Sequence, residues 1–302
     1  MPTEAVPTKT VPTNTVPTNT VPTEVAAPRY SRRLRRAGSY AALTVGAVVV
    51  LAPIYFTIVN SLLPPSQLAH QPPPLIPSSP QWHDYTQAWT SGHLARYMAT
   101  SAIMTISIVV AQLVTSTFAA YAFAFLRFPF KRTLFLLCLA TLMIPFEVTF
   151  ITNLDTLSSL GWFNTYEGLA VPFFATGFGI FLLRQAFLQI PKDLLEAARL
   201  DGYGHWRFMV RVAVPLARPS MAALGVFSFL AAWNQYLWPL LSTGGTSPLD
   251  TVQIGLKQLV GTSAQNIPIA LAGAVIAFVP LVILLLIFQK QLVRSLTAGA
   301  VK

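Results

Sequence analysis

The 302-residue sequence is 54% hydrophobic and only 10% charged, with a mean hydropathy of +0.57 and a formal net charge of +10. Soluble domains carry about 25% charged residues, so this composition predicts a membrane protein. The basic residues fall between long apolar runs, which argues against nucleic-acid binding as the reason for the positive charge. The single cysteine, Cys138, excludes intramolecular disulfides and cysteine-based metal clusters.

Residues 1–28 form a low-complexity segment in which Val-Pro-Thr recurs every five residues, at Val6, Val11, Val16 and Val21. Proline at this spacing blocks regular helix and sheet, and the segment has little apolar surface to bury. We expect a disordered, partly polyproline-II tail that is a dispensable extension, with docking of a partner as the alternative. The sequence therefore divides into this tail, 1–28, and a membrane domain, 29–302.

Six apolar runs are long enough to cross a bilayer, which needs about 20 helical residues. The first starts near Ser39 and is longer than the 7–15 residues of a signal-peptide core, so we expect it to remain as an anchor. The fold class predicted is an all-α membrane protein with six transmembrane helices. We place the spans at 39–61, 97–126, 133–152, 168–188, 220–241 and 268–288.

The distribution of basic residues predicts the topology. With both termini inside, the cytoplasmic segments hold 18 of the 20 lysines and arginines, and only Arg96 and Lys257 lie outside. Cytoplasmic loops of membrane proteins carry an excess of Lys and Arg. We therefore expect a multi-pass protein of the cytoplasmic membrane with both termini inside.

A polar loop of about 30 residues, 189–219, is longer than a connection between two spans requires. Pro191 suits the first turn of a helix there, with Asp193 and Glu196 near the positive helix end. Gly202 is placed to end that helix in a left-handed conformation, and Pro215 is placed to restart the chain into the fifth span. An amphipathic helix lying on the bilayer is the alternative interpretation.

This loop carries a spaced motif. Glu-Ala-Ala at Glu196, Ala197 and Ala198 is followed by Asp201 and Gly202, and nine residues later by Val-Ala-Val-Pro ending at Pro215. The spacing resembles the EAA loop of the permease subunits of ABC importers. In that family the loop is a cytoplasmic helix on which a separate ATPase pushes. The resemblance implies that the residues contacting the ATPase are Glu196, Ala197, Ala198, Asp201, Gly202 and Pro215.

Further segments resemble particular branches of this family. The C-terminal Leu-Thr-Ala-Gly-Ala-Val-Lys, 296–302, and the Trp-Asn segment 229–240 resemble maltose-type permeases. In those permeases the tail, here Thr297, Ala298, Gly299 and Ala300, reaches between two ATPase subunits. The segments 143–150 and 251–256 resemble permeases for glycerol-3-phosphate or glycerophosphodiesters such as glycerophosphocholine. A disaccharide or oligosaccharide importer of the trehalose or maltose type is the alternative.

Two polar residues inside predicted spans are candidates for the transport pathway. Glu147 is the only acidic residue within a span, and an ionisable group in a bilayer is a functional hypothesis by default. Contact with solute and a structural role near the outer surface are equally good interpretations. Asn234 can either bind solute hydroxyls or bridge helices. Four other polar residues within a predicted span are expected to mediate helix packing: Gln112, Thr115, Ser116 and Thr117.

The motifs that are missing also bear on function. No phosphate-binding loop is present, so ATP and Mg²⁺ would be bound by a partner ATPase, and we expect neither cofactor nor metal on this chain nor enzymatic activity. The partners implied are a second related permease, two ATPase subunits, an external substrate-binding protein and membrane lipid, working by alternating access. A proton-coupled secondary carrier using Glu147 is the rival from another class. It would need inverted repeats and an ionisable relay, and neither is apparent.

Overall fold

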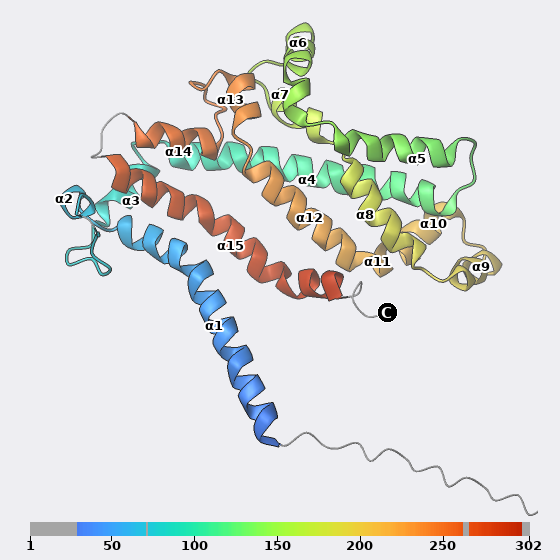
Figure 1. Cartoon of the computed structure of the whole chain (residues 1–302). Helices are drawn as coiled ribbons and strands as arrows, with labels where there is room; N and C mark the ends of the chain where they lie inside the picture. The colour runs from blue at the N-terminus through green and yellow to red at the C-terminus, as the bar shows by residue number, and fades with distance from the viewer. Residues whose placement is uncertain (1–28, 71, 262–265, 298–302) are drawn as a thin grey trace, which may run out of the picture. The chain divides into compact units, whose positions relative to one another are not determined.

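The computed structural model describes residues 29–70, 72–261 and 266–297, which form helices and loops with no β-strand among them (Figure 1). The chain divides into two units, Met1–Pro53 and Ile54–Lys302, and the boundary falls inside helix α1 (Arg29–Asn60). The remaining elements, in chain order, are α2 (Pro65–Leu68), α3 (His83–Trp89), α4 (Leu94–Phe125), α5 (Lys131–Ala140), η1 (Thr141–Met143), η2 (Phe146–Thr149), α6 (Phe150–Leu160), α7 (Tyr166–Ala170), η3 (Val171–Phe173), α8 (Gly177–Leu188), α9 (Lys192–Leu200), α10 (His205–Phe208), the π-helix η4 (Met209–Ala213), α11 (Val214–Leu216), α12 (Arg218–Trp233), α13 (Leu237–Thr243), α14 (Val252–Val260) and α15 (Ile267–Thr297).

The helices that can span a membrane are of two kinds. Three are continuous: Ala37–Asn60 within α1, α4, and Ile267–Gln291 within α15. The others are pairs of helices bent at a short break, by 92°, 45° and 76°: Lys131–Met143 with Phe146–Leu160, Tyr166–Phe173 with Gly177–Leu188, and His205–Leu216 with Arg218–Trp233. The described chain is therefore all-helical with three to six candidate spans. The structure interrupts the helix within the predicted spans 133–152, 168–188 and 220–241, at 144–145, 174–176 and 234–236 respectively.

Pro145 explains the sharpest of these breaks. Residues that precede a proline are pushed out of the helical region, and Ile144 is extended, with φ −88° and ψ 113°. Proline also lacks the backbone N–H that the next helical turn would use. The helix of the third predicted span therefore ends at Met143 and resumes at Phe146, so that α6 leaves α5 at a steep angle (Figure 1).

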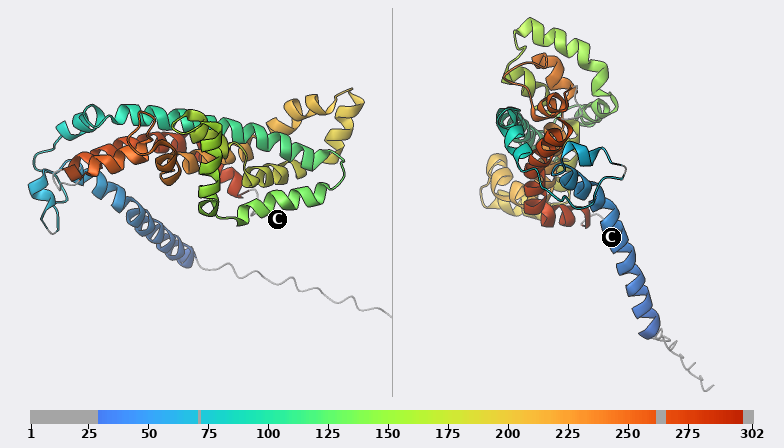
Figure 2. Two further views of the ribbon diagram at one scale, coloured as in Figure 1. Left: turned by 90° about the horizontal axis from the view of Figure 1, so that it is seen from above. Right: turned by 90° about the vertical axis from the view of Figure 1, so that its left-hand side faces the viewer.

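Helix α4 forms the centre of the second unit. It packs against α8 and α12, and α15 packs against α12 and α14 (Figures 1 and 2). Gly179 allows α8 to approach α4 closely, since a Cβ at this position would collide with the Ser116 hydroxyl. The long second predicted span therefore serves as the scaffold on which the broken spans are assembled.

Polar side chains on α4 satisfy backbone groups that the break between η3 and α8 leaves free. Gln112 Nε2 donates to the Phe173 carbonyl at 2.7 Å, and Thr115 Oγ1 donates to the Phe174 carbonyl at 2.8 Å. The Ser228 hydroxyl of α12 donates to Gln112 Oε1 at 2.5 Å. Neighbouring helices commonly satisfy carbonyls freed at a break within a bilayer. The predicted packing role of Gln112 and Thr115 is thus confirmed.

An aromatic cluster fixes two of the broken spans to α13. Phe146 lies 4.9 Å from Phe173 and 5.7 Å from Trp238, measured between ring centroids. The indole N–H of Trp238 donates to the Gly168 carbonyl at 3.1 Å in a buried bond. Such aromatic pairs stabilise by about 0.5–1.5 kcal/mol each beyond their buried area. The bends are therefore held by packing.

Candidate functional site

Helix α9 occupies the polar loop in which a helix was predicted. Pro191 is its N-cap, with φ −56° and ψ 137°, and Asp193 lies in the first turn, where the helix dipole favours a carboxylate. Two details of the sequence-based expectation are wrong. Pro191 precedes the helix, and Glu196 is the fifth helical residue, beyond the first turn to which the dipole effect is confined.

Gly202 ends α9 in the predicted left-handed conformation, with φ +76°. Asp201 is the C-cap, the Gly202 N–H donates to the Arg199 carbonyl at 3.0 Å, and the Tyr203 N–H donates to the Ala198 carbonyl at 2.8 Å. These two bonds define a Schellman motif, which satisfies the carbonyls at the helix end. A Cβ on Gly202 would meet nothing within 4 Å, so the turn requires glycine for its backbone conformation.

The apolar residues of α9 divide between two directions. Ala198 is only 7% exposed, and Leu195 packs with it against the rest of the chain. In contrast, Leu194 is 43% and Leu200 90% exposed, and Ala197 is exposed as well. The two alanines therefore differ. Ala198 is buried against other residues of this chain, whereas Ala197 belongs to an apolar surface, Leu194–Ala197–Leu200, that the described residues leave uncovered. We call this the outer face of α9.

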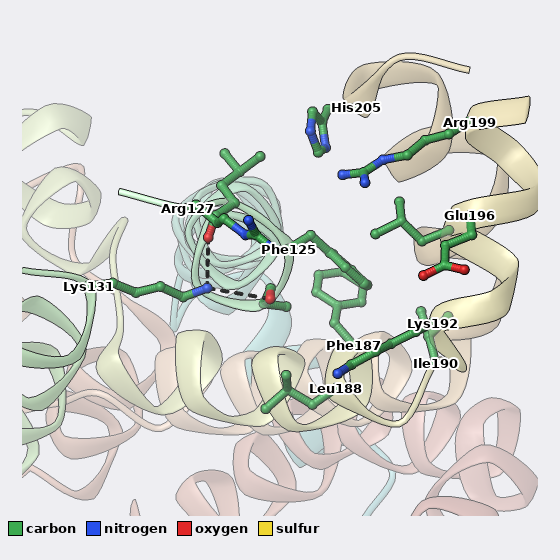
Figure 3. Close-up of a pocket in the computed structure, with 13 residues that line it drawn as sticks. Phe125, Arg127, Lys131, Phe187, Leu188, Ile190, Lys192, Glu196, Arg199 and His205 are labelled. Carbon is green, nitrogen blue, oxygen red and sulfur yellow. Dashed lines mark hydrogen bonds between the residues drawn. The ribbon is translucent and has the colours of Figure 1, made fainter. Parts of the chain in front are cut away.

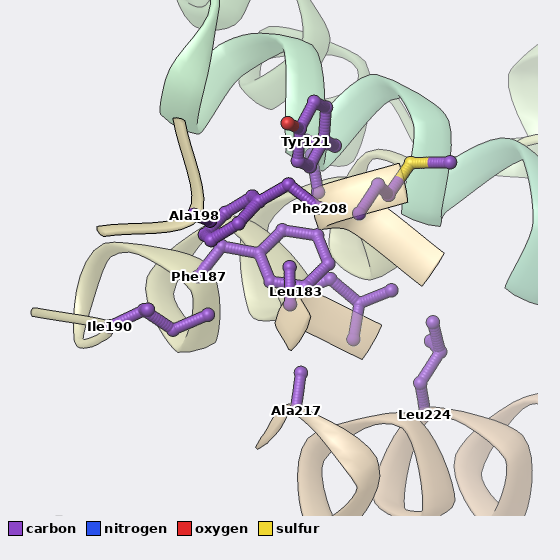
Figure 4. Packing of buried hydrophobic residues seen from close by; sticks show 11 residues of the cluster. Tyr121, Leu183, Phe187, Ile190, Ala198, Phe208, Ala217 and Leu224 are labelled. Atoms are coloured by element: carbon purple, nitrogen blue, oxygen red, sulfur yellow. The ribbon is translucent and has the colours of Figure 1, made fainter. Parts of the chain in front are cut away.

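The inner side of α9 is anchored in a buried cluster (Figure 4). The cluster that contains Ala198 also contains Phe208 of α10, Leu183 and Phe187 of α8, and Tyr121 of α4. Tyr121 also exchanges a hydrogen bond of 3.0 Å with His205 Nδ1. Apolar packing therefore fixes α9 to the ends of α4 and α8, and the Tyr121–His205 contact fixes the following helix, α10, to α4.

The segment after α9 returns to the membrane domain through a distorted helix. Residues 205–216 run through α10, the π-helix η4 and α11, and a 76° bend separates them from α12. Pro215 lies inside α11, and α12 begins at Arg218 with a proline in its first turn. Pro215 therefore lies near the end of the first helix of this bent pair, and the second helix, α12, begins three residues later at Arg218.

A cavity of about 770 Å³ lies between α9 and the ends of α4 and α8 (Figure 3). Helix α9 contributes one stripe of side chains to it, at the spacing i, i+3, i+4 and i+7: Lys192, Leu195, Glu196 and Arg199. Glu196 thus lines this cavity and is not part of the outer face. The remaining lining residues are Ala124, Phe125, Leu126, Arg127, Lys131, Phe187, Leu188, Ile190 and His205.

The two candidates for the transport pathway lie at helix breaks. Glu147 is exposed in the turn η2, directly after the break at Pro145. Asn234 is the exposed C-cap of α12, where its Nδ2 donates to the Leu230 carbonyl at 2.8 Å and its Oδ1 accepts a long bond of 3.4 Å from Gln253. No hydrogen bond or ion pair within the described chain joins the two residues. Their neighbours Phe146 and Trp238 meet in the aromatic cluster.

Sequence reasoning missed two features of these sites. Gln253 of α14 bonds both to Asn234 and to the Trp233 carbonyl, although it lies within the segment 251–256 that was used only to compare families. The second feature is the basic lining of the cavity: in the sequence, these lysines and arginines indicate only which segments lie on the cytoplasmic side. The predicted ATPase-contacting tail falls at the end of the described residues, since α15 ends at Thr297 and Ala298, Gly299 and Ala300 lie outside them. Residues 29–70, 72–261 and 266–297 contain no group of three or more metal-ligating side chains.

Comparison with known proteins places these features in context. A model of the family described as "binding-protein-dependent transport system inner membrane component" matches residues 112–298. The sn-glycerol-3-phosphate transport system permease protein UgpE of Agrobacterium fabrum is 34% identical over 275 residues, covering 88% of this chain and 97% of that protein. UgpE of Rhizobium meliloti is 35% identical over 263 residues, covering 84% and 93%.

The fold also matches a solved structure. A chain from a bacterial ABC transporter involved in the import of the acidic polysaccharide alginate superposes with a TM-score of 0.75 at 21% identity, covering 88% of this chain and 98% of that chain. A chain of the alginate ABC transporter in complex with an alginate pentasaccharide-bound periplasmic protein gives a TM-score of 0.51 at 15% identity. At these identities the match concerns the fold alone.

Proposed function

Since this chain belongs to the family of binding-protein-dependent transport system inner membrane components, we propose that it carries glycerol-3-phosphate or a glycerophosphodiester such as glycerophosphocholine across the cytoplasmic membrane. It is a multi-pass membrane protein and a permease of the carbohydrate-type ABC importers. The permease would pair with a second, related permease, and two ATPase subunits would bind and hydrolyse Mg-ATP. An external binding protein would deliver the solute. Both termini would lie in the cytoplasm, with six spans per chain.

The observation that carries the ATPase-driven mechanism in this proposal is the division of α9 into two faces. An element that transmits force between two proteins must be fixed to one and accessible to the other. Ala198 and Leu195 fix α9 to α4 and α8, while the outer face, Leu194–Ala197–Leu200, is uncovered. The outer face would receive the ATPase, and the buried cluster would pass its movement to the spans as a rigid-body displacement.

The solute class is supported by relatives and limited by the chemistry of the pathway. Curated relatives 33–35% identical over most of the chain are permeases named for sn-glycerol-3-phosphate. The exposed carboxylate of Glu147 would repel a phosphate unless a cation lay between them. Glu147 and Asn234 would therefore contact hydroxyl groups of the solute, and the charge that attracts phosphate would come from the partner permease or the binding protein.

A competition assay tests the solute assignment. The transporter, assembled with its partner permease, ATPase and binding protein, would be reconstituted in vesicles, and ATP-driven uptake of labelled glycerol-3-phosphate would be measured. We expect unlabelled glycerol-3-phosphate or glycerophosphocholine to compete, and maltose and trehalose to have no effect. Competition by the disaccharides alone would favour the alternative assignment. Uptake that needs no ATP and stops when the proton gradient is dissipated would indicate a secondary carrier.

A further inference from the structure

The cavity beneath α9 lies where the membrane-spanning helices end. Its lining includes the last turn of α4, at Ala124 and Phe125, and the last residues of α8, at Phe187 and Leu188. Both helices belong to candidate spans. The cavity therefore lies at the ends of two candidate spans, and the four residues that these span ends contribute to its lining are apolar.

The same cavity lining carries an excess of positive charge. Arg127 comes from the connection between α4 and α5, Lys131 is the first residue of α5, and Lys192 and Arg199 come from α9. Glu196 is the one carboxylate in the lining (Figure 3). None of these five groups forms an ion pair within 4.0 Å in the described part of the chain, where the one such contact is between His83 and Asp84. The cavity thus offers more cationic groups than its own carboxylate can neutralise.

An exposed aromatic pair bears on where the bilayer boundary lies. Trp206, the neighbour of the cavity-lining His205, is 65% exposed and stacks on exposed Phe118 of α4 with ring centroids 5.8 Å apart. Tryptophan is enriched at membrane–water interfaces, where its apolar ring and polar N–H are both accommodated. An exposed aromatic pair between α10 and α4 is what a bilayer boundary at this end of the spans would favour.

We propose that this cavity binds the phosphate-bearing head group of an anionic phospholipid, with Arg127, Lys192 and Arg199 contacting the phosphate and the apolar residues at the span ends contacting the first part of the acyl chains. The inference uses the topology of the proposed function, which places the cavity in the cytoplasmic leaflet. That leaflet carries anionic lipids, and basic pockets between helices on the cytoplasmic side suit their head groups.

The arrangement of α9 favours a lipid over an acidic segment of the ATPase. The stripe that lines the cavity is Lys192, Leu195, Glu196 and Arg199, whereas the outer face consists of Leu194, Ala197 and Leu200. An ATPase on the outer face and a lipid on the cavity side would therefore occupy different sides of the same helix. A bound lipid would tie α9 to the end of α4 and so stiffen the connection between the ATPase and the spans.

Native mass spectrometry of the assembled transporter in detergent, titrated with phosphatidylglycerol or phosphatidylcholine, tests this site. Arg127→Gln removes one exposed cavity arginine outside α9, and Arg211→Gln is the matched control, an exposed arginine of η4 that does not line the cavity. We expect Arg127→Gln to weaken phosphatidylglycerol binding about fivefold and the Arg127→Gln/Lys192→Gln double variant about 25-fold. Arg211→Gln should bind as the wild type does, and phosphatidylcholine should show no dependence on any variant.

Three results would overturn the proposal. An equal loss in Arg211→Gln would mean that diffuse surface charge holds the lipid. Displacement of phosphatidylglycerol by inorganic phosphate would assign the site to the free anion, and loss of ATPase from Arg127→Gln with unchanged lipid binding would assign it to the ATPase. The titration uses neither ATP nor solute. A wild-type transporter that shows normal uptake but no preference for phosphatidylglycerol therefore rejects this inference alone. Normal lipid binding without ATP-driven uptake rejects the proposed function alone.

Discussion

We expect the substitution Gly202→Asp to separate the permease from its ATPase while leaving the membrane domain folded. Gly202 has φ +76° and completes the Schellman motif that ends α9. Any L-residue in this conformation is strained by roughly 1–2 kcal/mol, somewhat less for aspartate. Leaving the conformation instead would sacrifice two capping hydrogen bonds, each with a net value of about 0.5–1.5 kcal/mol.

Either route lowers the ratio of correctly ended to frayed α9 by about 5- to 30-fold, since this is the factor that one or two kcal/mol represents. A Cβ at Gly202 meets nothing within 4 Å in this chain, so packing of the spans should be unaffected. The added carboxylate next to Asp201 would also lie beside the outer face. We therefore expect co-purification of the ATPase and solute transported per ATP hydrolysed to fall together, with unchanged membrane insertion.

Gly204 provides the matched control for this experiment. It lies in the same loop with φ −73°, and a Cβ there also meets nothing within 4 Å. Gly204→Asp adds the same side chain and charge at a helix N-cap, a position that favours aspartate, and should behave as the wild type. Retention of ATPase binding and coupling at wild-type values in Gly202→Asp would refute the assignment of this loop as the coupling element. Equal damage from Gly204→Asp would show that charge, and not the left-handed turn, is responsible.

The remaining predictions concern the tail, the pathway and the two faces of α9. Deleting residues 1–28 should leave assembly and uptake unchanged, and lost uptake at equal protein level would contradict this. Glu147→Gln and Glu147→Ala should lower uptake while substrate-independent ATPase activity survives, whereas unchanged kinetics in both would assign the carboxylate a structural role. Because Glu196 lies beyond the first turn, Glu196→Ala should release less ATPase than Gly202→Asp; a larger release would reveal a direct contact. Ala198→Leu should lower the free energy of unfolding by about 1–3 kcal/mol through overpacking, while Ala197→Leu should weaken ATPase retention without changing thermal unfolding; equal thermal effects would refute the two-faced account of α9.

Features encoded locally could be predicted from the sequence. The apolar runs predict helices because only helices satisfy every backbone group within lipid. The spacing of Gly202 after Ala198 predicts the end of α9 because few residues other than glycine adopt a positive φ. These two inferences place the helical membrane domain and the loop without any long-range information.

The positions of the breaks within the spans and the two faces of α9 could not be predicted, because they depend on contacts between residues distant in sequence. A proline either kinks or ends a helix, and the outcome depends on whether other segments satisfy the freed groups. At the break after Phe173 those partners are Gln112 and Thr115, about 60 residues away. Leu194 and Leu195 are equally apolar, and only the packing of α9 on the cluster of Phe187 and Phe208 decides that Leu195 is partly buried and Leu194 exposed. Hydropathy alone carries none of this information.

Cross-linking from α9 tests the central claim most directly, namely that its outer face receives the ATPase. Cys138 would be replaced by serine, and a photoactivatable reagent would be attached to a single new cysteine in the assembled transporter, at Leu200→Cys on the outer face or at Ala198→Cys in the buried cluster. We expect Leu200→Cys to cross-link to the ATPase and Ala198→Cys to cross-link within the permease. An intact, ATP-hydrolysing complex in which Leu200→Cys never reaches the ATPase would contradict the account.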